Sequence, residues 1–573
     1  MTELILSHER VDDIPLLIGL MQHLRLPELL DTHLGNHGHH QGLRNGWLGT
    51  VWLAFVLSEG DHRKSSVQAW VQRHQQTLER LLHQDIRPTD FTDDRLGNLL
   101  RRMSHTDDWN ALEAALWHTT LDVYAVEVTG VRLDSTTITG YHTLTEDGLM
   151  QLGHSKDHRP DLPQLKLMAA AAEPAGHLLA HDIVAGQHAD DPLYLPLIRR
   201  VRQVLGQAGL LYSGDCKMAA LATRAEIVQY GDYYLTPLPL TGTTGADLDA
   251  WITAIVDGNQ IGTLIWDAER LLGGGYELTR PQQATIGTQV VSWIERVQVV
   301  RSPDLARAAA ARLEERLRRA ATAISNLTPP CGRGKRQIRD EATLTAAISH
   351  ILDHEQVAGL MQVTWERQET VMTRLVGRGR RGANRPIQTE VQVRYQISTV
   401  ERDAATVARH MMRLGWRGQV TNLPQERMTL AQAVRHYRGG WCEERGFHLL
   451  KDRPLGIRPL YVQRADQIVG LTRLLTLAWR LLTLIETQVR RALTDDQATL
   501  AGLYDGQPNR TTARPTATRL LKAVARTEIT LTRVDVGAQL FWHLTPLPAW
   551  VVQVLGYLGL SVAHYTRLLE NSS

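Results

Sequence analysis

The sequence predicts an α/β protein in which a mixed β-sheet core is interrupted by an inserted mixed α/β domain and bordered by helical N- and C-terminal regions. Three observations support this fold class. Apolar residues recur with helical periodicity over 14–125, short strand-like runs alternate with helical runs from about 129, and this order is lost between about 241 and 415. At 573 residues the chain exceeds what one hydrophobic core supports, so several domains are expected.

We expect five consecutive segments along the chain. They are a helical N-terminal domain, the first part of the core, an insertion domain, the second part of the core and a helical C-terminal region, over 1–125, 126–240, 241–415, 416–490 and 491–573. A Pro/Thr-rich patch at 508–518 is typical of a linker.

The first part of the core begins with a strand in which Val131 and Leu133 alternate with polar residues and lead into Asp134. A hairpin, a helix, a strand ending at Asp215, a helix and a strand are then predicted, over 165–184, 191–206, 210–214, 218–229 and 233–240. This is the element order of the ribonuclease H-like fold, in which the first and fourth strands lie parallel and adjacent. Asp134 and Asp215, each expected at the carboxyl end of its strand, would therefore emerge together.

The insertion has a different pattern. Strand-like runs occur at 290–300, 359–365 and 391–398, and an Ala/Arg/Glu-rich helix is predicted at 303–326. The core then resumes at 418–421 and continues into a helix that contains Glu444.

Composition limits the function classes. The net charge is only +2, so basic surface must come from local clusters such as the arginine-rich runs 333–339 and 378–385. Three well-separated cysteines exclude a disulfide framework and a CxxC zinc site. No secretory signal is recognisable at the N-terminus, and Arg473 and Arg480 interrupt the most apolar stretch, 468–485, which predicts a buried helix. We therefore expect a cytoplasmic protein without membrane contact.

One predicted helix carries a candidate site. Tyr437, Glu444 and Lys451 are spaced by seven residues and would share one stripe of the helix. A carboxylate beside an ammonium suits metal and phosphate binding, although surface helices also carry such pairs without function. Four of the seven lysines lie in the segments that hold the three acids, at positions 156, 166, 217 and 451.

These runs resemble the DDE transposases of bacterial insertion sequences. The matching motifs are Leu-Asp-Ser-Thr at 133–136, the Gly-His-Ser-Lys-Asp-His-Arg-Pro-Asp-Leu run at 153–162, Gly-Asp at 214–215, Tyr-x6-Glu-x6-Lys at 437–451 and Gly-Ile-Arg-Pro-Leu-Tyr at 456–461. Within this group the chain is similar to the insertion-sequence-four clan, which carries a Tyr-x2-Arg-x3-Glu-x6-Lys signature. The resemblance extends over roughly 90–490. The signature arginine is replaced by Gly440, and Arg438 or Arg445 are the nearby substitutes.

The resemblance implies two-metal phosphoryl transfer. Asp134, Asp215 and Glu444 would hold two Mg²⁺ or Mn²⁺ ions, cut DNA at the element's ends and join the freed 3′-hydroxyl to target DNA. It also implies a set of DNA-contacting side chains: Tyr437, Arg438, Arg445, Lys451, Lys156, Arg159, Lys217 and Trp416. Trp416 would stack on a flipped base, or would instead be a core aromatic.

The resemblance further implies terminal-repeat recognition by 1–125, closure over DNA by the insertion, and pairing through 491–573, which predicts a homodimer on double-stranded DNA in the bacterial cytoplasm. Two alternatives stay open: a ribonuclease H-like nuclease without strand transfer, and a DNA-binding derivative that has lost catalysis. Asp190 and Asp191 are interpreted as helix-capping residues, and Asp157 as a structural or substrate-loop residue, rather than as metal ligands.

Overall fold

The computed structural model describes most of the chain, as 4–36, 41–332, 334–376, 386–536 and 539–570. By contacts between Cα atoms the protein divides into two compact units. Unit 1 comprises Met1–Thr236, Gln283–Trp293 and His436–Ser573, and unit 2 comprises Pro237–Gln282 and Ile294–Arg435. The predicted arginine-rich run at 378–385 lies outside the described residues, as does Arg333.

Unit 1 opens with a strand and a helical region. Strand β1 (Leu4–Arg10) precedes helices that confirm the helical periodicity of the sequence: α1 (Ile14–His23), α2 (Leu26–Leu34), α3 (Asn45–Glu59), α4 (Lys64–Arg73), α5 (Gln75–Leu82), α6 (Asp93–Met103) and α7 (Thr106–Tyr124). Their apolar faces form one continuous core that includes Trp52, Trp70 and Trp109, each fully buried. Burial of such large rings is a major source of stability in this region.

A mixed sheet forms the centre of unit 1. Its strands are β2 (Gly130–Thr139), β3 (Gln164–Glu173), β4 (His177–Ala185), β5 (Leu211–Gly214) and β6 (Tyr233–Pro237), in the spatial order β4-β3-β2-β5-β6. β2, β3 and β4 pair antiparallel, whereas β2 pairs parallel with β5 and β5 parallel with β6. The predicted hairpin is confirmed, and so is the parallel pairing of the first and fourth core strands.

The crossovers to the parallel strands are helical, as parallel pairing requires. α8 (Tyr194–Leu205) connects β4 to β5, after a short 3₁₀ turn at Asp191–Leu193, and α9 (Leu221–Gln229) connects β5 to β6. Strand β2 is longer than predicted, because it continues past Asp134 to Thr139 and pairs with β3 along its whole length. Asp134 therefore lies within a strand and not at its end.

A long helix, α16 (Ala465–Asp495), runs through unit 1 and packs against α3, α6, β4 and α15 (Trp441–Lys451). Among the described helices it is the one that is long and apolar enough to cross a membrane, but 89% of its apolar window is buried inside the protein. The prediction of a buried helix at 468–485 is confirmed.

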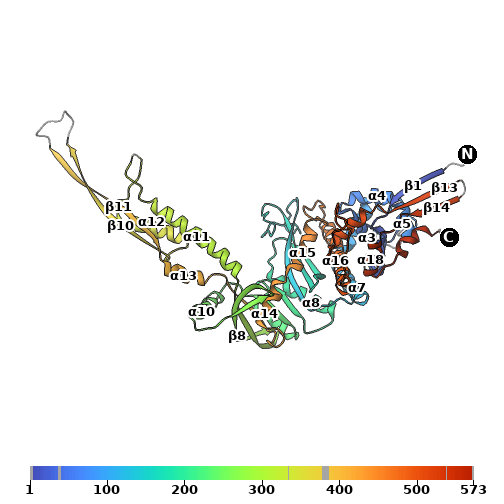
Figure 1. Cartoon of the computed structure of the whole chain (residues 1–573), viewed down its shortest axis with the longest axis horizontal. Coiled ribbons are helices and arrows are strands. Elements are labelled where there is room, and N and C mark those ends of the chain that lie inside the picture. The colour runs from blue at the N-terminus through green and yellow to red at the C-terminus, as the bar shows by residue number, and fades with distance from the viewer. Residues whose placement is uncertain (1–3, 37–40, 333, 377–385, 537–538, 571–573) are drawn as a thin grey trace. The chain divides into compact units, whose positions relative to one another are not determined.

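The C-terminal region is less helical than expected. It contains α17 (Ala517–Ala525), the hairpin β13 (Thr530–Val536) and β14 (Gln539–Leu544), and the helices α18 (Ala549–Tyr557) and α19 (Ala563–Thr566). β1 pairs antiparallel with β13, so the N-terminal strand lies beside a strand of the C-terminal region in unit 1 (Figure 1). β-branched residues alternate along β13, which is the strand signal that the sequence reading missed.

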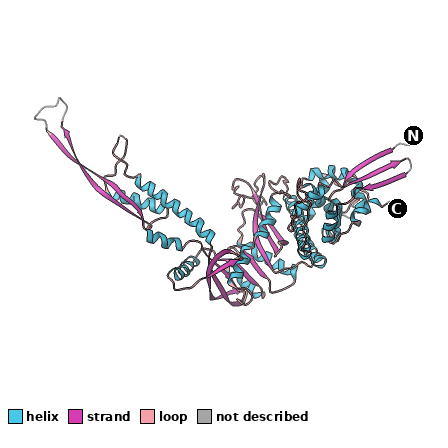
Figure 2. Ribbon diagram, viewed as in Figure 1, coloured by secondary structure: helices cyan, strands magenta, loops and turns pink. Residues whose placement is uncertain are grey.

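Unit 2 contains the inserted segment. Its elements are α10 (Thr244–Val256), β7 (Thr263–Asp267), β8 (Arg270–Ile286), β9 (Gln289–Arg301), α11 (Pro303–Ser325), α12 (Glu341–His354), β10 (Met361–Leu375), β11 (Ile387–Arg402), α13 (Ala404–Met412) and β12 (Trp416–Thr421). The tip of the β8–β9 hairpin groups with unit 1. Figure 2 shows β10 and β11 as a long two-stranded ribbon beside α11 and α12. The segment predicted as an insertion therefore combines helices and strands.

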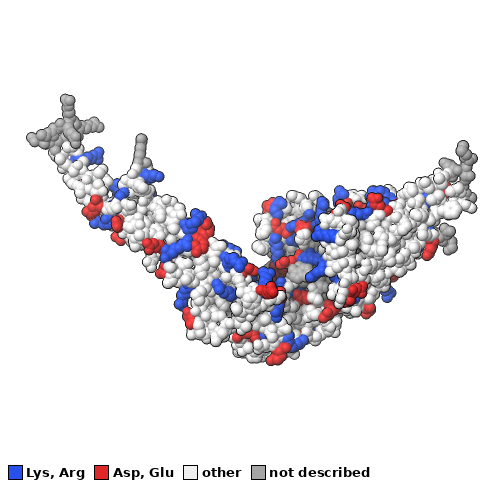
Figure 3. Space-filling model, viewed as in Figure 1, with Lys and Arg blue, Asp and Glu red and all other residues white. Residues whose placement is uncertain are grey.

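On the face seen in Figure 3, charged side chains of both signs are distributed over the surface. On the visible face of each unit, Lys and Arg side chains alternate with Asp and Glu side chains (Figure 3). This agrees with the small net charge of +2. Recognition of an anionic partner must therefore depend on local groups of basic residues.

Candidate active site

Two carboxylates predicted to be catalytic lie next to each other, Asp134 within β2 and Asp215 directly after β5. The parallel ladder of β2 and β5 pairs Arg132 with Ser213 and Leu133 with Gly214, and the next residues are Asp134 and Asp215. Neighbouring strands lie about 4.8 Å apart, and residues in register project from the same face of a sheet. The sheet therefore brings the two acids together, as their sequence positions predicted.

Asp134 is held by a lysine and by the backbone. Its Oδ1 accepts hydrogen bonds from the Ser135 amide at 2.7 Å and from Lys156 Nζ at 3.2 Å. Lys156 Nζ also donates to the Ser135 carbonyl at 2.6 Å and to its hydroxyl at 2.8 Å. Burial raises the pKa of Asp134 and the neighbouring Asp215 carboxylate adds to this, while Lys156 and the Ser135 amide oppose it. A divalent cation would favour the charged form in the same way as Lys156 does.

Asp215 is oriented by a different set of donors. Its Oδ1 accepts from the Tyr194 hydroxyl at 2.6 Å and from the Lys217 amide at 2.8 Å, and its own carbonyl accepts from the Thr236 hydroxyl at 2.7 Å. These contacts connect the end of β5 to α8 and β6. The carboxylate is thereby fixed in direction before any ligand arrives.

The two aspartates are suitable ligands for a hard divalent cation. Oδ1 of each aspartate is occupied by hydrogen bonds, whereas no described residue donates to Oδ2 of Asp134 or Oδ2 of Asp215. Two oriented carboxylates with one uncommitted oxygen each are the ligand type that Mg²⁺ and Mn²⁺ prefer. Within the described part of the chain, no group of three His, Cys, Asp or Glu side chains is arranged to hold a metal ion.

Glu444 is not gathered with the two aspartates. It lies on α15, and its side chain is exposed. The predicted single helix is interrupted: α14 (Leu430–Arg438) ends before Gly439 and Gly440, and α15 begins at Trp441. The expectation that Tyr437, Glu444 and Lys451 share one helical stripe is therefore wrong. Two consecutive glycines cost about 1 kcal/mol each in a helix interior relative to alanine, which explains the break.

The far end of α15 is attached to the loop that carries Lys156. Lys451 Nζ lies 2.6 Å from Asp157 Oδ1, and Arg458 lies 2.9 Å from the same oxygen and 2.6 Å from Asp452. Asp157 is almost fully buried, with 5% of its side chain exposed. It forms ion pairs inside unit 1, which agrees with the first of the two roles predicted for it, structural or substrate-loop.

The position of the missing signature arginine is filled by another arginine. A Cβ atom added at Gly440 would lie 2.9 Å from the NH1 atom of Arg132. Arg132 is buried on β2, pairs with Glu173 at 2.7 Å and donates to the His436 carbonyl at 2.9 Å. His436 in turn lies 3.0 Å from Glu173 and 2.9 Å from the Ser213 hydroxyl. The sequence reading proposed Arg438 or Arg445 as substitutes and missed Arg132.

Restoring the signature arginine in this chain should therefore be harmful. We expect Gly440→Arg to lower the free energy of unfolding by roughly 2 kcal/mol, because a second guanidinium would be forced against Arg132. The double variant Arg132→Ala/Gly440→Arg should recover part of the loss, with a coupling of about 0.5–3 kcal/mol. Chemical unfolding of the single and double variants measures this. Gly245→Arg is the matched control, since nothing lies within 4 Å of a Cβ there. Purely additive effects of the two changes would contradict the conclusion that Arg132 occupies the space next to Gly440.

The remaining predicted DNA-contacting residues lie in different places. Lys217 is half-exposed and 3.5 Å from Asp191, Arg159 is paired with Asp161 at 2.7 Å, and Arg445 pairs with Glu486. Arg132 lies 5.9 Å from the centre of the Tyr437 ring. Arg438 is exposed, and Trp416 belongs to unit 2, where its indole nitrogen donates to the Met412 carbonyl at 2.9 Å. Lys156 and Lys217 are thus the predicted contacts that directly neighbour the two aspartates.

The acidic pair at the start of α8 corrects one prediction. Asp190 makes no side-chain cap, and instead lies 2.5 Å from Lys166 and 3.8 Å from Lys156. The nearly buried Lys166 ammonium needs a counter-charge more than the helix terminus does. Lys166 thus ties this acid to β3, and Lys156 ties it to the loop beside Asp134.

Comparisons with known proteins add a distant structural likeness. No family model matches the chain, and no curated protein matches it. Among solved structures, the chain is similar to the cryo-EM structure of the piggyBac transposase synaptic complex with hairpin DNA, with a TM-score of 0.33 and 6% sequence identity, over 90% of this chain and 80% of that chain.

Proposed function

We propose that this chain is a metal-dependent DNA transposase with Asp134, Asp215 and Glu444 as its catalytic carboxylates. The observation that carries the proposal is the in-register pair of aspartates beyond the last paired residues of the parallel β2–β5 ladder. The order β4-β3-β2-β5-β6, with its antiparallel and parallel pairings, supports a ribonuclease H-like core. The Tyr-x6-Glu-x6-Lys spacing supports Glu444 as the third acid.

The proposed chemistry is in-line displacement at phosphorus. Two Mg²⁺ or Mn²⁺ ions, when bound, would activate the attacking oxygen and stabilise the leaving oxygen. Asp134 and Asp215 would hold them through Oδ2, while Tyr194 and the Lys217 amide keep Asp215 in position. The Lys156 ammonium, which is bonded to Asp134, lies where it can contact a backbone phosphate.

Glu444 requires a change in the direction of α15 to join the pair. Gly439 and Gly440 precede this helix, and glycine backbones accept a wider range of dihedral angles than other residues. Binding of DNA phosphates near Lys156 and Lys217 would favour this movement of α15 toward the two aspartates. The protein would act as a homodimer on transposon ends and target DNA in the bacterial cytoplasm.

A strand-transfer assay tests the proposal. The substrate is a labelled duplex copied from the DNA that borders the coding region, incubated with purified protein, a target plasmid and either Mg²⁺, Mn²⁺ or EDTA. We expect nicking and joined products with either cation and neither product with EDTA. Nicking without joining would favour a nuclease.

A second candidate is a DNA-binding derivative without catalysis. It is favoured by the exposed position of Glu444 outside any group of three acids among the described residues. In that case the same duplex binds, but no cation produces cleavage. Gel-shift and cleavage measurements on one preparation separate the two candidates.

A further inference from the structure

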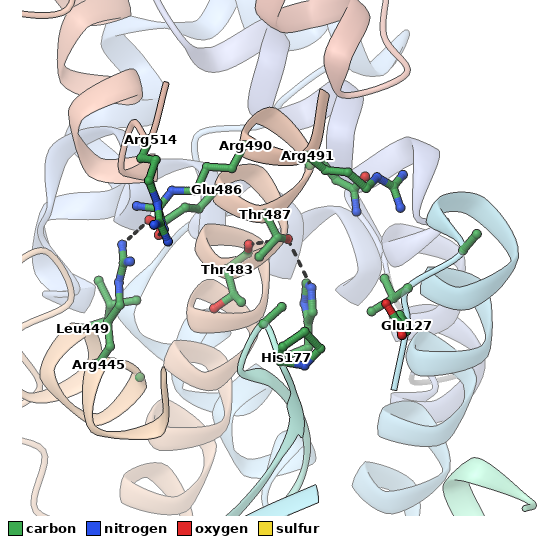
Figure 4. Close-up of a pocket in the computed structure, with 16 residues that line it drawn as sticks. Glu127, His177, Arg445, Leu449, Thr483, Glu486, Thr487, Arg490, Arg491 and Arg514 are labelled. Atoms are coloured by element: carbon green, nitrogen blue, oxygen red, sulfur yellow. Dashed lines mark hydrogen bonds and ion pairs between the residues drawn. The ribbon is translucent and has the colours of Figure 1, made fainter. Parts of the chain in front are cut away.

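A cavity of about 520 Å³ lies in unit 1 beside α15. Residues of α15, α16, the turn after β3, the segment after α7 and the loop before α17 line it (Figure 4). Its charged lining residues are Arg445, Arg490, Arg491, Arg514, Glu127 and Glu486. Four guanidinium groups and two carboxylates thus line one cavity that is open to solvent on one side, which leaves an excess of two positive charges around it.

One of the two carboxylates is already fully engaged. Glu486 is almost buried, with 8% of its side chain exposed, and it pairs with Arg445 and with Arg490, the latter at 2.6 Å. It also accepts a hydrogen bond from the Ala517 amide at 3.2 Å. Glu486 therefore cannot neutralise a third guanidinium.

The other guanidiniums retain unused donors. The Arg514 side chain is exposed and has no hydrogen-bond or ion-pair partner among the residues that the structure describes. Among the described residues, the Arg491 guanidinium has one hydrogen-bond partner, the Tyr124 carbonyl, which accepts from Nη1 at 3.1 Å. Burial lowers the pKa of Arg490, and the nearby charges of Arg445 and Arg514 lower it further, against the opposing effect of Glu486. An anion at this end would relieve that repulsion.

A neutral wall lies around His177 and is bordered by the charged side chains of Glu127 and Arg491 (Figure 4). His177 is buried next to Arg480, and its pKa is lowered to about 4 by desolvation first and by Arg480 second, so its ring is neutral at pH 7. The Thr487 hydroxyl lies 3.1 Å from His177 Nε2 and donates to the Thr483 carbonyl at 2.8 Å. Val126 adds apolar surface to this wall, whereas Leu449 lies beside Arg445 (Figure 4). This wall suits the uncharged part of a ligand.

We propose that the cavity binds a phosphate group, with the arginine end holding the phosphate oxygens and the neutral wall accommodating an attached sugar or base. Guanidinium forks match phosphate oxygens in pairs, and several of them can surround one tetrahedral anion. A space of about 520 Å³ accepts a nucleotide but not a duplex. The phosphate would therefore come from a free nucleotide or from a single-stranded DNA end. The proposal goes beyond the transposase function and does not depend on it.

Calorimetric titration tests the proposal with defined probes: inorganic phosphate, deoxyadenosine 5′-monophosphate, and a short single-stranded oligonucleotide with or without a 5′-phosphate. We expect binding of the phosphorylated probes. Arg514→Gln should weaken it by about 10-fold or more, because a charge-assisted hydrogen bond is lost without disturbing a protein contact. Arg312→Gln, at an exposed α11 position, is the matched control and should bind as the wild type does.

The outcomes separate the two sources of phosphate. Tighter binding of the 5′-phosphorylated than of the 5′-hydroxyl oligonucleotide supports a DNA end, whereas tight binding of the nucleotide alone supports a small ligand. Failure of every phosphorylated probe to bind, or equal binding by Arg514→Gln and the wild type, overturns the proposal. Asp134→Asn should bind phosphate normally, so loss of cleavage and loss of this site are distinguishable.

Discussion

Asp215→Asn is expected to lower the rate of DNA cleavage by about 10³-fold while leaving DNA binding intact. The substitution keeps the size of the side chain but removes the charge that a divalent cation needs, and several kcal/mol of transition-state stabilisation correspond to such a factor. Asp134→Asn and Glu444→Gln should have the same effect. Initial rates with Mg²⁺ on the labelled duplex, together with binding anisotropy on the same duplex, measure both quantities.

Asp505→Asn is the control for these variants. Asp505 is exposed in a turn after α16, and its side chain has no hydrogen bond or ion pair with a described residue. If Asp505→Asn cleaves DNA at the wild-type rate while Asp215→Asn does not, the loss of cleavage is assigned to the aspartate pair. Cleavage at close to the wild-type rate by Asp134→Asn or Asp215→Asn would contradict the assignment of the catalytic pair.

Local patterns were sufficient to predict the aspartate pair. Val131 and Leu133 alternate with polar residues and mark β2, and the apolar run before Asp215 marks β5. Since a helix separates β5 from the preceding hairpin, parallel pairing with β2 follows from general rules of connection. The register that places Asp134 beside Asp215 agrees with this reasoning.

The third acid shows where sequence reasoning fails. Spacing by seven residues predicts a shared face only if one helix is continuous, and Gly439 and Gly440 interrupt it. Each glycine alone is tolerated in a helix, so the outcome depends on tertiary contacts. One such contact is the Arg132 guanidinium against Gly440, which comes from a strand about 300 residues away in sequence.

Local sequence patterns could not predict the arginine-lined cavity either. Arg445, Arg490 and Arg514 are separated in sequence, and each alone resembles an ordinary surface arginine. They gather because α15 packs against α16 and the loop before α17 returns to the same place. Contacts of this kind are set by packing and cannot be read from spacing.

A buried ionic network connects the helical region of unit 1 to its sheet. Glu113 on α7 accepts hydrogen bonds from His181 Nδ1 on β4 at 2.8 Å and from Arg480 on α16, and Arg200 on α8 lies 3.7 Å away. Glu113 and His181 are fully buried. Burial alone would raise the pKa of Glu113, but His181, Arg480 and Arg200 lower it to about 2.

Glu113→Ala should therefore be among the most damaging single substitutions in unit 1. It leaves the buried Arg480 without its carboxylate, and breaking such a pair by removing one partner costs about 3–5 kcal/mol. The pH dependence has a definite sign. Because the pKa of Glu113 falls from 4.5 to about 2 on folding, its contribution is complete above pH 4.5 and is lost as the pH falls toward 2. The variant should lack this part of the acid dependence.

Chemical unfolding at pH 7 and pH 3 measures both effects in the wild type and in Glu113→Ala. A further variant, Glu113→Leu/Arg480→Met, removes both charges and keeps most of the volume. Buried ion pairs are often replaced by apolar residues without loss, so this variant should be much more stable than Glu113→Ala. If both variants lose the same free energy of unfolding relative to the wild type, then altered packing around α7 causes the destabilisation, and the uncompensated guanidinium does not. If Glu113→Ala unfolds like the wild type, the network does not contribute to the fold.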